Sequence, residues 1–355
     1  MRRRFLSNIN KSISGGNHSK YFTIEALEDG LTAKLSKNAS EYRIDDGSWN
    51  TLSANTNTPS VNKGQTLSFK GSLTPNNGIG TFTISKKCNV KGNIMSLLYG
   101  DNFEGQNDLT GKNYAFYRLF YNCKTIVDVS ELILPATTLA SYCYTNMFYG
   151  CKSLTSAPQL PATTLASYCY QNMFKGCTSL TTAPELPATK LKDSCYCYMF
   201  GNTNVLPDCS NIDFTNNAVV ASGGLKGLFA GTKVTDADLE RILPKNNEGK
   251  YCLSVTTLAT ECYYQMFRNC TNLTSAPELP ATTLANDCYY YMFNGCSKLN
   301  YIKMLATDIS AQRCLSNWVK GVASSGTFVK NAAMTTLPSG ASGIPTGWTI
   351  EDAVI

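Results

Sequence analysis

Apolar residues return along this chain with a period of 26 residues. Leu134, Leu160 and Leu186 each open an LPAT phrase, and Cys262 and Cys288 mark later copies of the same phrase at the same spacing. A short period repeated in tandem is typical of an array in which each unit buries its apolar face only against its neighbours. The pattern therefore predicts a column of stacked repeats.

Each repeat divides into an extended stretch and a segment with helical periodicity. Pro158 and Pro161 exclude a long helix in the extended stretch. In the next segment Cys143 and Met147 lie one helical turn apart, and Gly150 follows as a C-cap glycine would. We therefore predict an α+β fold, a right-handed leucine-rich-repeat solenoid with one extended stretch and one short helix in each coil.

Shorter runs in which apolar and polar residues alternate precede the repeats. Residues 21–93 contain several such runs, separated by turn signals such as Asp45-Asp46-Gly47, and predict a small all-β, sandwich-like domain. Where the period is lost, Thr235 is a predicted helix cap, with Asp238 three residues later. The predicted organisation is a basic tail at 1–20, the β-domain at 21–93, a solenoid at 94–305 with a divergent unit at 201–253, and a capping region at 306–355 that begins with a helix.

Comparison of the repeats with one another separates two kinds of position. Columns that hold Leu, Cys, Tyr, Met and Phe in copy after copy are predicted core. Four columns around them vary and are rich in Tyr, Asn and Gln, a combination typical of adaptable recognition surfaces. Ordinary drift of solvent-facing positions is the alternative explanation of the same columns. The predicted ligand-binding residues are Tyr142, Asn146, Tyr149, Tyr168, Gln171, Asn172, Tyr264, Gln265, Arg268, Tyr290 and Tyr291.

The net charge of +6 is concentrated at the start of the chain. Five basic residues precede the first acidic one, Glu25, and removing them from the total of 31 leaves 26 against 25 acidic residues. A nearly neutral body argues against a broad nucleic-acid-binding face. Blocks of like charge are often interaction tails, although a solvated tail and a nucleic-acid contact are alternatives. The predicted assembly-anchoring residues are Arg2, Arg3, Arg4 and Lys11.

The 15 cysteines include two columns that lie eight residues apart within a repeat, as Cys143 and Cys151 do. One interpretation is two ladders of buried thiols that act as small apolar residues. The other is a set of disulfides between stacked repeats, which the roughly 4.8 Å spacing of stacked strands permits. Because the columns lack CxxC pairs, no zinc site is predicted.

Candidate catalytic groups are few. The single histidine, His18, lies in the tail, outside any segment that would fix it beside a nucleophile, and no phosphate-binding glycine motif occurs. The run Asp236, Asp238 and Glu240 contains the carboxylates of a cation site, but helix capping is the favoured interpretation. We therefore predict no catalytic residue, no metal, no cofactor and no enzymatic activity.

Neither a leader nor a membrane span is predicted. The basic start is not followed by the apolar run of a signal peptide. No stretch approaches the roughly 18 apolar residues that a spanning helix needs. We therefore expect a chain that is assembled in the cytoplasm.

The pattern CYxxMFxGCxxLTxAPxLPATTL, over about residues 92–305, resembles the BspA-like leucine-rich repeats of bacterial surface proteins. The domain organisation is also similar to that of proteins encoded by bacteriophages of gut bacteria. The resemblance implies a non-enzymatic binding or adhesion protein. Because no export signal accompanies it, we predict a virion protein, a fibre or a capsid decoration. Its tail would join a larger protein assembly, its solenoid would bind a host-surface glycan or protein, and homo-oligomers are compatible with this role. The alternatives are an exported bacterial cell-surface adhesin and, in another class, a glycan-processing enzyme.

Overall fold

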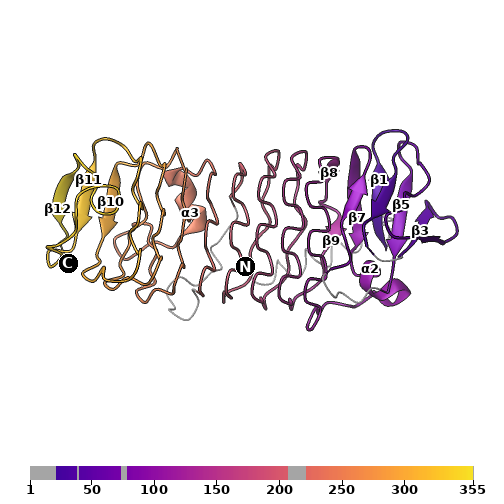
Figure 1. Cartoon of the computed structure of the whole chain (residues 1–355), viewed down its shortest axis with the longest axis horizontal. Helices are drawn as coiled ribbons and strands as arrows, with labels where there is room; N and C mark the ends of the chain where they lie inside the picture. The colour runs from indigo at the N-terminus through magenta and orange to yellow at the C-terminus, as the bar shows by residue number, and fades with distance from the viewer. Residues whose placement is uncertain (1–20, 38–39, 73–77, 207–220, 355) are drawn as a thin grey trace.

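The computed structural model describes residues 21–37, 40–72, 78–206 and 221–354, and Figure 1 shows an elongated molecule built as a stack. A β-sheet lies at the N-terminal end, a run of coils follows it, and three short strands lie at the C-terminal end. Successive coils are successive sequence repeats, so the long axis of the molecule follows the order of the repeats.

The N-terminal sheet has the strand order β4-β3-β5-β1-β7-β8, and β9 also pairs with β7. Its antiparallel strands are β1 (Phe22–Ala26), β3 (Ser40–Ile44), β4 (Asn50–Leu52), β5 (Thr66–Lys70) and β7 (Cys88–Asn93). A separate two-stranded sheet contains β2 (Ala33–Leu35) and β6 (Phe82–Ile84). The rings of Phe22, Phe69 and Phe82 pack together with centroids 5.1–6.0 Å apart and form the core of this region.

Strand β7 joins this sheet to the repeats. It pairs antiparallel with β1 on one side and parallel with β8 (Ile126–Asp128) and β9 (Leu132–Ile133) on the other. The ring of Phe82 also stacks on Phe120, the first ring of the repeat core, at 5.8 Å. The N-terminal end of the stack is therefore closed by both backbone hydrogen bonds and apolar contact. The short helices α2 (Ser96–Tyr99) and η1 (Gly100–Asn102) follow β7.

Each coil contains a run of tight turns that is hydrogen-bonded in two directions. The N–H of Thr145 donates to the carbonyl of Tyr142, three residues earlier, whereas the N–H of Tyr144 donates to Cys169 of the next coil. Local and inter-coil bonds alternate in this way along the segment, and the other coils repeat the arrangement. The alternation satisfies the buried backbone groups without a helix or a long strand.

Like side chains stack along the array and form its core. One column of rings consists of Phe120, Phe148, Phe174 and Phe200, with centroids 5.3–5.6 Å apart. Phe229, Phe267 and Phe293 form the same column in later coils. A second column holds Tyr144, Tyr170 and Tyr196 at 5.7 and 5.9 Å. These residues are fully or almost fully buried, which confirms the predicted core columns.

The C-terminal end consists of three parallel strands, β10 (Tyr301–Met304), β11 (Thr327–Lys330) and β12 (Thr349–Asp352). Before them, the divergent unit contains η2 (Asp236–Asp238) and α3 (Leu239–Ile242). The predicted cap is present there, because the Thr235 N–H donates to Asp238 Oδ2 at 2.9 Å.

The predicted fold class is wrong. We expected an α+β leucine-rich-repeat solenoid with a helix in every coil, preceded by a sandwich-like domain. In the described residues the α-helices are α2 and α3, of four residues each, and the regular structure is mostly strands in several sheets. The segment after Asp308, predicted as a helix, is also a run of turns. The spacing of Cys143 and Met147 misled the prediction because these turns, like a helix, return a side chain to the same face every four residues.

Fourteen of the 15 cysteines lie in the described residues, and all fourteen are buried and unpaired. The thiols of one column bond to the backbone of the preceding coil: Cys151 donates to the Phe120 carbonyl at 3.1 Å and Cys177 to the Phe148 carbonyl at 3.0 Å. Burial raises the pKa of Cys177 to about 12, so the thiol stays protonated. For these residues the structure agrees with the buried-thiol interpretation and not with disulfides.

Candidate functional site

The variable columns of the repeats form one surface of the stack, which we call the turn face. Four positions in the turn segment of each coil contribute to it, and most of their side chains are half-buried. Taken position by position along the eight coils, the residues are Tyr114, Tyr142, Tyr168, Ser194, Gly223, Glu261, Asp287 and Arg313; Tyr117, Thr145, Gln171, Cys197, Lys226, Tyr264, Tyr290 and Ser316; Arg118, Asn146, Asn172, Tyr198, Gly227, Gln265, Tyr291 and Asn317; and Tyr121, Tyr149, Lys175, Gly201, Ala230, Arg268, Asn294 and Lys320.

The backbone of the turn face is left-handed at the first and third of these positions. In all eight coils φ there lies between +50° and +62°. This region is easily reached by glycine and tolerated by asparagine, whereas other L-residues pay about 1 kcal/mol or more to enter it. Tyr142, Tyr168, Arg118 and Gln265 are therefore held in a costly conformation.

A neighbouring column shows what the backbone alone would select. One position after the turn face, φ is again positive, and the eight coils hold only glycine or asparagine there: Asn122, Gly150, Gly176, Asn202, Gly231, Asn269, Gly295 and Gly321. A Cβ at Gly150 would lie 2.2 Å from Asn122 Oδ1. Because Gly223 and Gly227 occupy the first and third positions of the fifth coil, glycine also fits the turn face. The backbone conformation alone therefore does not account for the bulky residues that the other coils hold at these positions.

Tyrosines of the first three coils stack on one another. The ring of Tyr142 lies between those of Tyr114 and Tyr168, with centroid distances of 4.7 and 4.6 Å and interplanar angles of 7° and 4°. We call these three residues the tyrosine ladder. A second stack on the same coils joins Tyr121 and Tyr149 at 5.0 Å. Burial raises the pKa of Tyr142, and the neighbouring phenols add to the shift, so its hydroxyl stays neutral and able to donate.

Cations lie against these rings and hold them in place. The guanidinium of Arg118 lies over Tyr117 and Tyr121, at 5.1 and 4.8 Å from the ring centroids. In the later coils the ammonium of Lys226 lies 4.0 Å from the centroid of Tyr264. Such contacts contribute about 0.5–1 kcal/mol each at exposed sites. The aromatic surface therefore also carries fixed positive charge.

A second group of turn-face residues surrounds Gln265. Its Oε1 accepts hydrogen bonds from the Tyr198 hydroxyl at 2.6 Å and from Arg268 Nη1 at 3.2 Å. The guanidinium of Arg268 in turn lies 5.5 Å from the centroid of Tyr291. We call these four residues the glutamine cluster. Two hydrogen bonds to Gln265 Oε1 and the contact of Arg268 with Tyr291 therefore join the four side chains, whereas Arg268 Nε has no hydrogen-bond partner among the described residues.

Charged pairs flank the glutamine cluster on neighbouring coils. Lys226 Nζ donates to Glu261 Oε1 at 2.9 Å, and Arg313 Nη2 donates to Asp287 Oδ2 at 2.9 Å. The ring of Tyr264 contacts the Lys226 ammonium and also stacks on the ring of Tyr290, with the two ring centroids 4.7 Å apart. The turn face therefore offers both signs of charge at its C-terminal half.

Gly227 allows Tyr198 to reach across a whole coil. Tyr198 belongs to the fourth coil and Gln265 to the sixth, and the tyrosine ring passes over Gly227 of the fifth. A Cβ on Gly227 would lie 2.1 Å from the ring carbon Cε1. Burial under this arrangement raises the pKa of Tyr198 well above its usual range. The absence of a side chain at Gly227 thus lets Tyr198 connect the fourth coil to the sixth.

The predicted ligand-binding residues all lie on the turn face, but the structure divides them into two groups. Tyr142, Asn146, Tyr149, Tyr168, Gln171 and Asn172 lie on the second and third coils, and Tyr264, Gln265, Arg268, Tyr290 and Tyr291 lie on the sixth and seventh. The comparison of repeats missed Tyr114, Tyr117 and Arg118, because the first coil lies 28 residues before the second and escapes the 26-residue period. The predicted anchoring residues, Arg2, Arg3, Arg4 and Lys11, lie outside the described residues.

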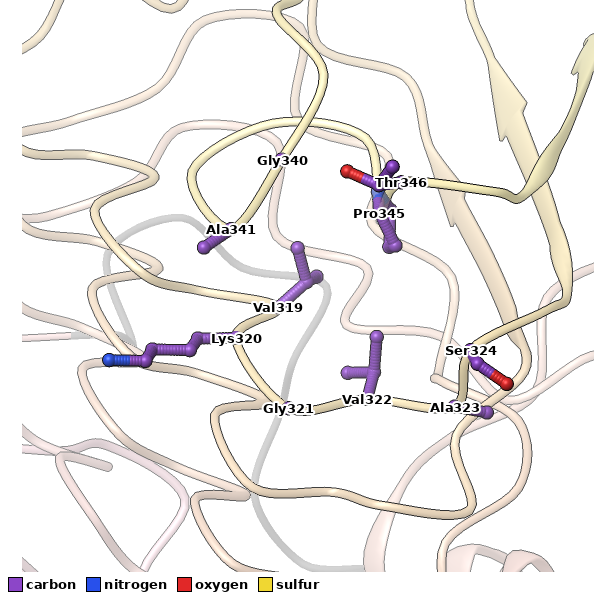
Figure 2. Close-up of a pocket in the computed structure, with 10 residues that line it drawn as sticks. All are labelled: Val319, Lys320, Gly321, Val322, Ala323, Ser324, Gly340, Ala341, Pro345 and Thr346. Atoms are coloured by element: carbon purple, nitrogen blue, oxygen red, sulfur yellow. The ribbon is translucent and has the colours of Figure 1, made fainter.

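Small cavities also occur among the described residues, and two of them are well defined. One, of about 210 Å³, lies between the loops 319–324 and 340–346, and Figure 2 shows Val319, Val322 and Pro345 around it. The other, of about 30 Å³, is lined by residues that include Glu25 and Asp128. Both are smaller than the roughly 300–1,000 Å³ of typical small-molecule sites. An extended surface is therefore a better candidate for recognition than either cavity.

The described residues contain no group of three or more His, Cys, Asp or Glu side chains placed to hold a metal ion. No helix in this part of the chain has the length and apolar character needed to cross a membrane.

No known protein family, curated protein or solved structure matches the chain. The resemblance to BspA-like repeats therefore stays a prediction from the sequence pattern.

Proposed function

We propose that the chain is a non-enzymatic binding protein that recognises its partner through the turn face. One observation carries the proposal: tyrosine, arginine and glutamine occupy left-handed positions where glycine would be less strained. Costly conformations that the surrounding structure holds in place are concentrated at functional sites. The cost is explained if these side chains are needed for contact with a partner.

The stacking of the tyrosine ladder favours a protein as that partner. Both faces of the Tyr142 ring are covered by its neighbours, so the ladder offers ring edges and hydroxyl groups. Eight coils at roughly 4.8 Å spacing give a face roughly 34 Å long. This length is comparable with the width of the roughly 800 Å² patch that each partner buries in an interface of standard size. Tyrosine and arginine are also the residues that most often dominate the energy of such interfaces.

One observation favours a glycan as the second candidate. Tyr168 is the last ring of the tyrosine ladder, and the following coils hold Ser194 and Gly223 at its position. Among the described residues, no ring or cation other than Tyr142 lies against it. A sugar ring could stack on this face as aromatic rings do in binding sites. Display of the protein on a virion stays a prediction, with display on a bacterial surface as its alternative.

Binding of the labelled protein to intact cells of a panel of bacterial strains, measured by flow cytometry, tests the proposal. The variant carrying Tyr142→Asn and Tyr168→Asn should lose at least about tenfold in affinity, corresponding to about 1.4 kcal/mol. Asparagine tolerates the left-handed backbone, so the fold should persist. The matched control is Thr163→Asn with Thr189→Asn, which changes two exposed residues outside the turn face.

Treatment of the cells separates the two candidates. Protease treatment should abolish binding if the partner is a protein, and periodate oxidation should abolish it if the partner is a glycan. Equal binding by the turn-face variant and the control on a strain that binds the wild type would contradict the proposal.

A further inference from the structure

The C-terminal end of the stack has an open strand edge. Strand β12 pairs with β11 on one side and, within the described residues, with no strand on the other. The N–H groups of Thr349 and Ala353 donate to Gly326 and Lys330 of the preceding coil, at 2.9 and 2.7 Å. Because hydrogen-bonding direction alternates along a strand, the N–H groups of Ile350 and Asp352 point away from the stack.

The hydrophobic core is uncovered at the same edge. Ile302, Phe328 and Ile350 are in register on β10, β11 and β12, so their side chains lie on the same face of the sheet. Ile302 and Phe328 are fully buried, whereas Ile350 is 52% exposed. Ile350 is therefore a core residue that lacks the covering which the next coil supplies elsewhere. Val354, four residues later, is 95% exposed.

The N-terminal end of the coil stack differs, because it is covered by the β-sheet, whose outer edge is the three-residue strand β4. There β7 uses both its edges, one for β1 and the other for β8 and β9. A second copy of the chain therefore has no equivalent coil edge to add to at that end. Among the coil edges of the described residues, the C-terminal one is open, and two copies that pair through it form a contact that closes at two copies.

We propose that β12 of one copy pairs antiparallel with β12 of a second copy to form a two-fold, tail-to-tail dimer. With the axis at Ile350, the two Ile350 side chains lie opposite each other, and Glu351 lies opposite Thr349. This register covers the open end of each core and places no like charges directly opposite each other, which would destabilise a strand pair. The outward N–H groups of Ile350 gain partners in the same step.

The strength of the dimer should be modest. A strand of four residues covers less surface than the roughly 1,200–2,000 Å² of a stable interface. The association should therefore be reversible and depend on protein concentration. Replacing Ile350 by a charged residue would leave that charge in the centre of the contact and should weaken the dimer at least about tenfold.

Sedimentation equilibrium of the full chain over a wide concentration range tests the proposal. The wild type should fit a monomer–dimer equilibrium, and Ile350→Lys should remain a monomer over the same range. Ile133→Lys is the matched control, since Ile133 is also an exposed isoleucine, 42% exposed, but lies on β9 at the other end. It should dimerise as the wild type does. A wild type that is monomeric throughout, assemblies larger than two, or an Ile350→Lys variant that still dimerises would each overturn the proposal.

A covalent trap keeps the test decisive if Ile350→Lys does not fold. Ile350→Cys should form an intermolecular disulfide under mild oxidation, because the opposed Cα atoms of such a pair lie about 5.5 Å apart, within disulfide range. Ile133→Cys should not. The fourteen described native cysteines are buried, so they offer little background reaction. Equal cross-linking of the two variants would also overturn the proposed contact.

Discussion

Replacing Gly227 by alanine should break the contact that Tyr198 makes across the fifth coil. The new Cβ would lie 2.1 Å from the tyrosine ring, whereas ordinary contact begins near 3.4 Å. The obstruction is the body of the ring and not the end of a flexible chain, so the ring must move by about 1 Å or more. That movement would separate the Tyr198 hydroxyl from Gln265 Oε1, which are 2.6 Å apart.

Two terms determine the size of the effect. Gly227 has φ +59°, and alanine in this region costs about 1 kcal/mol relative to glycine. The lost hydrogen bond costs about 1 kcal/mol more, and a buried group left without a partner adds to it. The free energy of unfolding should therefore fall by about 2–3 kcal/mol in total.

Urea-induced unfolding followed by circular dichroism measures this difference. The matched control is Gly111→Ala, where φ is +74° and no atom lies within 4 Å of the added Cβ. It should lose only the backbone term of about 1 kcal/mol. In a Tyr198→Ala background, Gly227→Ala should cost no more than this control. The reasoning would be refuted if Gly227→Ala and Gly111→Ala were equally destabilising, or if removal of the Tyr198 ring left the cost of Gly227→Ala unchanged.

Two further predictions concern the core. Burial raises the pKa of Cys143 and Cys288 to about 12 and that of Cys197 to about 11. Below the unfolded pKa of about 8.5, the contribution of these thiols to the free energy of unfolding is fully present. Above that pH, the contribution of each thiol falls by about 1.4 kcal/mol per pH unit until the pH reaches the pKa of the thiol in the folded state. Urea unfolding at several pH values should therefore show stability falling steeply above about pH 9, and constant stability between pH 8 and 10 would contradict this. Separately, Phe148→Ala should lower the free energy of unfolding by about 3–5 kcal/mol, because its buried ring stacks on Phe120 and Phe174. A cost below about 1 kcal/mol in the same urea assay would show that these rings do not carry the core.

The tandem phrase allowed the core of the array to be predicted from the sequence. Columns such as Tyr144 and Tyr170 are buried and stacked, as their identity from repeat to repeat indicated. The reason is that stacked units place equivalent residues against each other, so the same side chain must fit above and below itself. The variable columns were likewise correctly placed together, because positions that escape this constraint lie on a common face.

The conformation of each coil was not predictable from that pattern. A helix and a chain with a left-handed residue at every fourth position both return Cys143 and Met147 to the same face, so spacing alone does not distinguish them. The glycine or asparagine that the coils hold at positions such as Gly150 and Asn122 is the available signal, but a glycine at Gly150 also fits a helix C-cap. Tyrosines at Tyr142 and Tyr168 hid the remaining left-handed positions, because tyrosine seldom adopts that conformation.

The sequence by itself determined that the chain stacks in 26-residue units, which residues lie inside, and which columns lie outside. Only the tertiary structure decided how the side chains of those outer columns contact one another. The tyrosine ladder and the bond between Tyr198 and Gln265 depend on the distance between coils and on the space above Gly227. The open edge at β12 likewise depends on which strands find partners. A repeat specifies contacts between equivalent positions, whereas contacts between different positions and the closure of the two ends arise only once the coils are assembled.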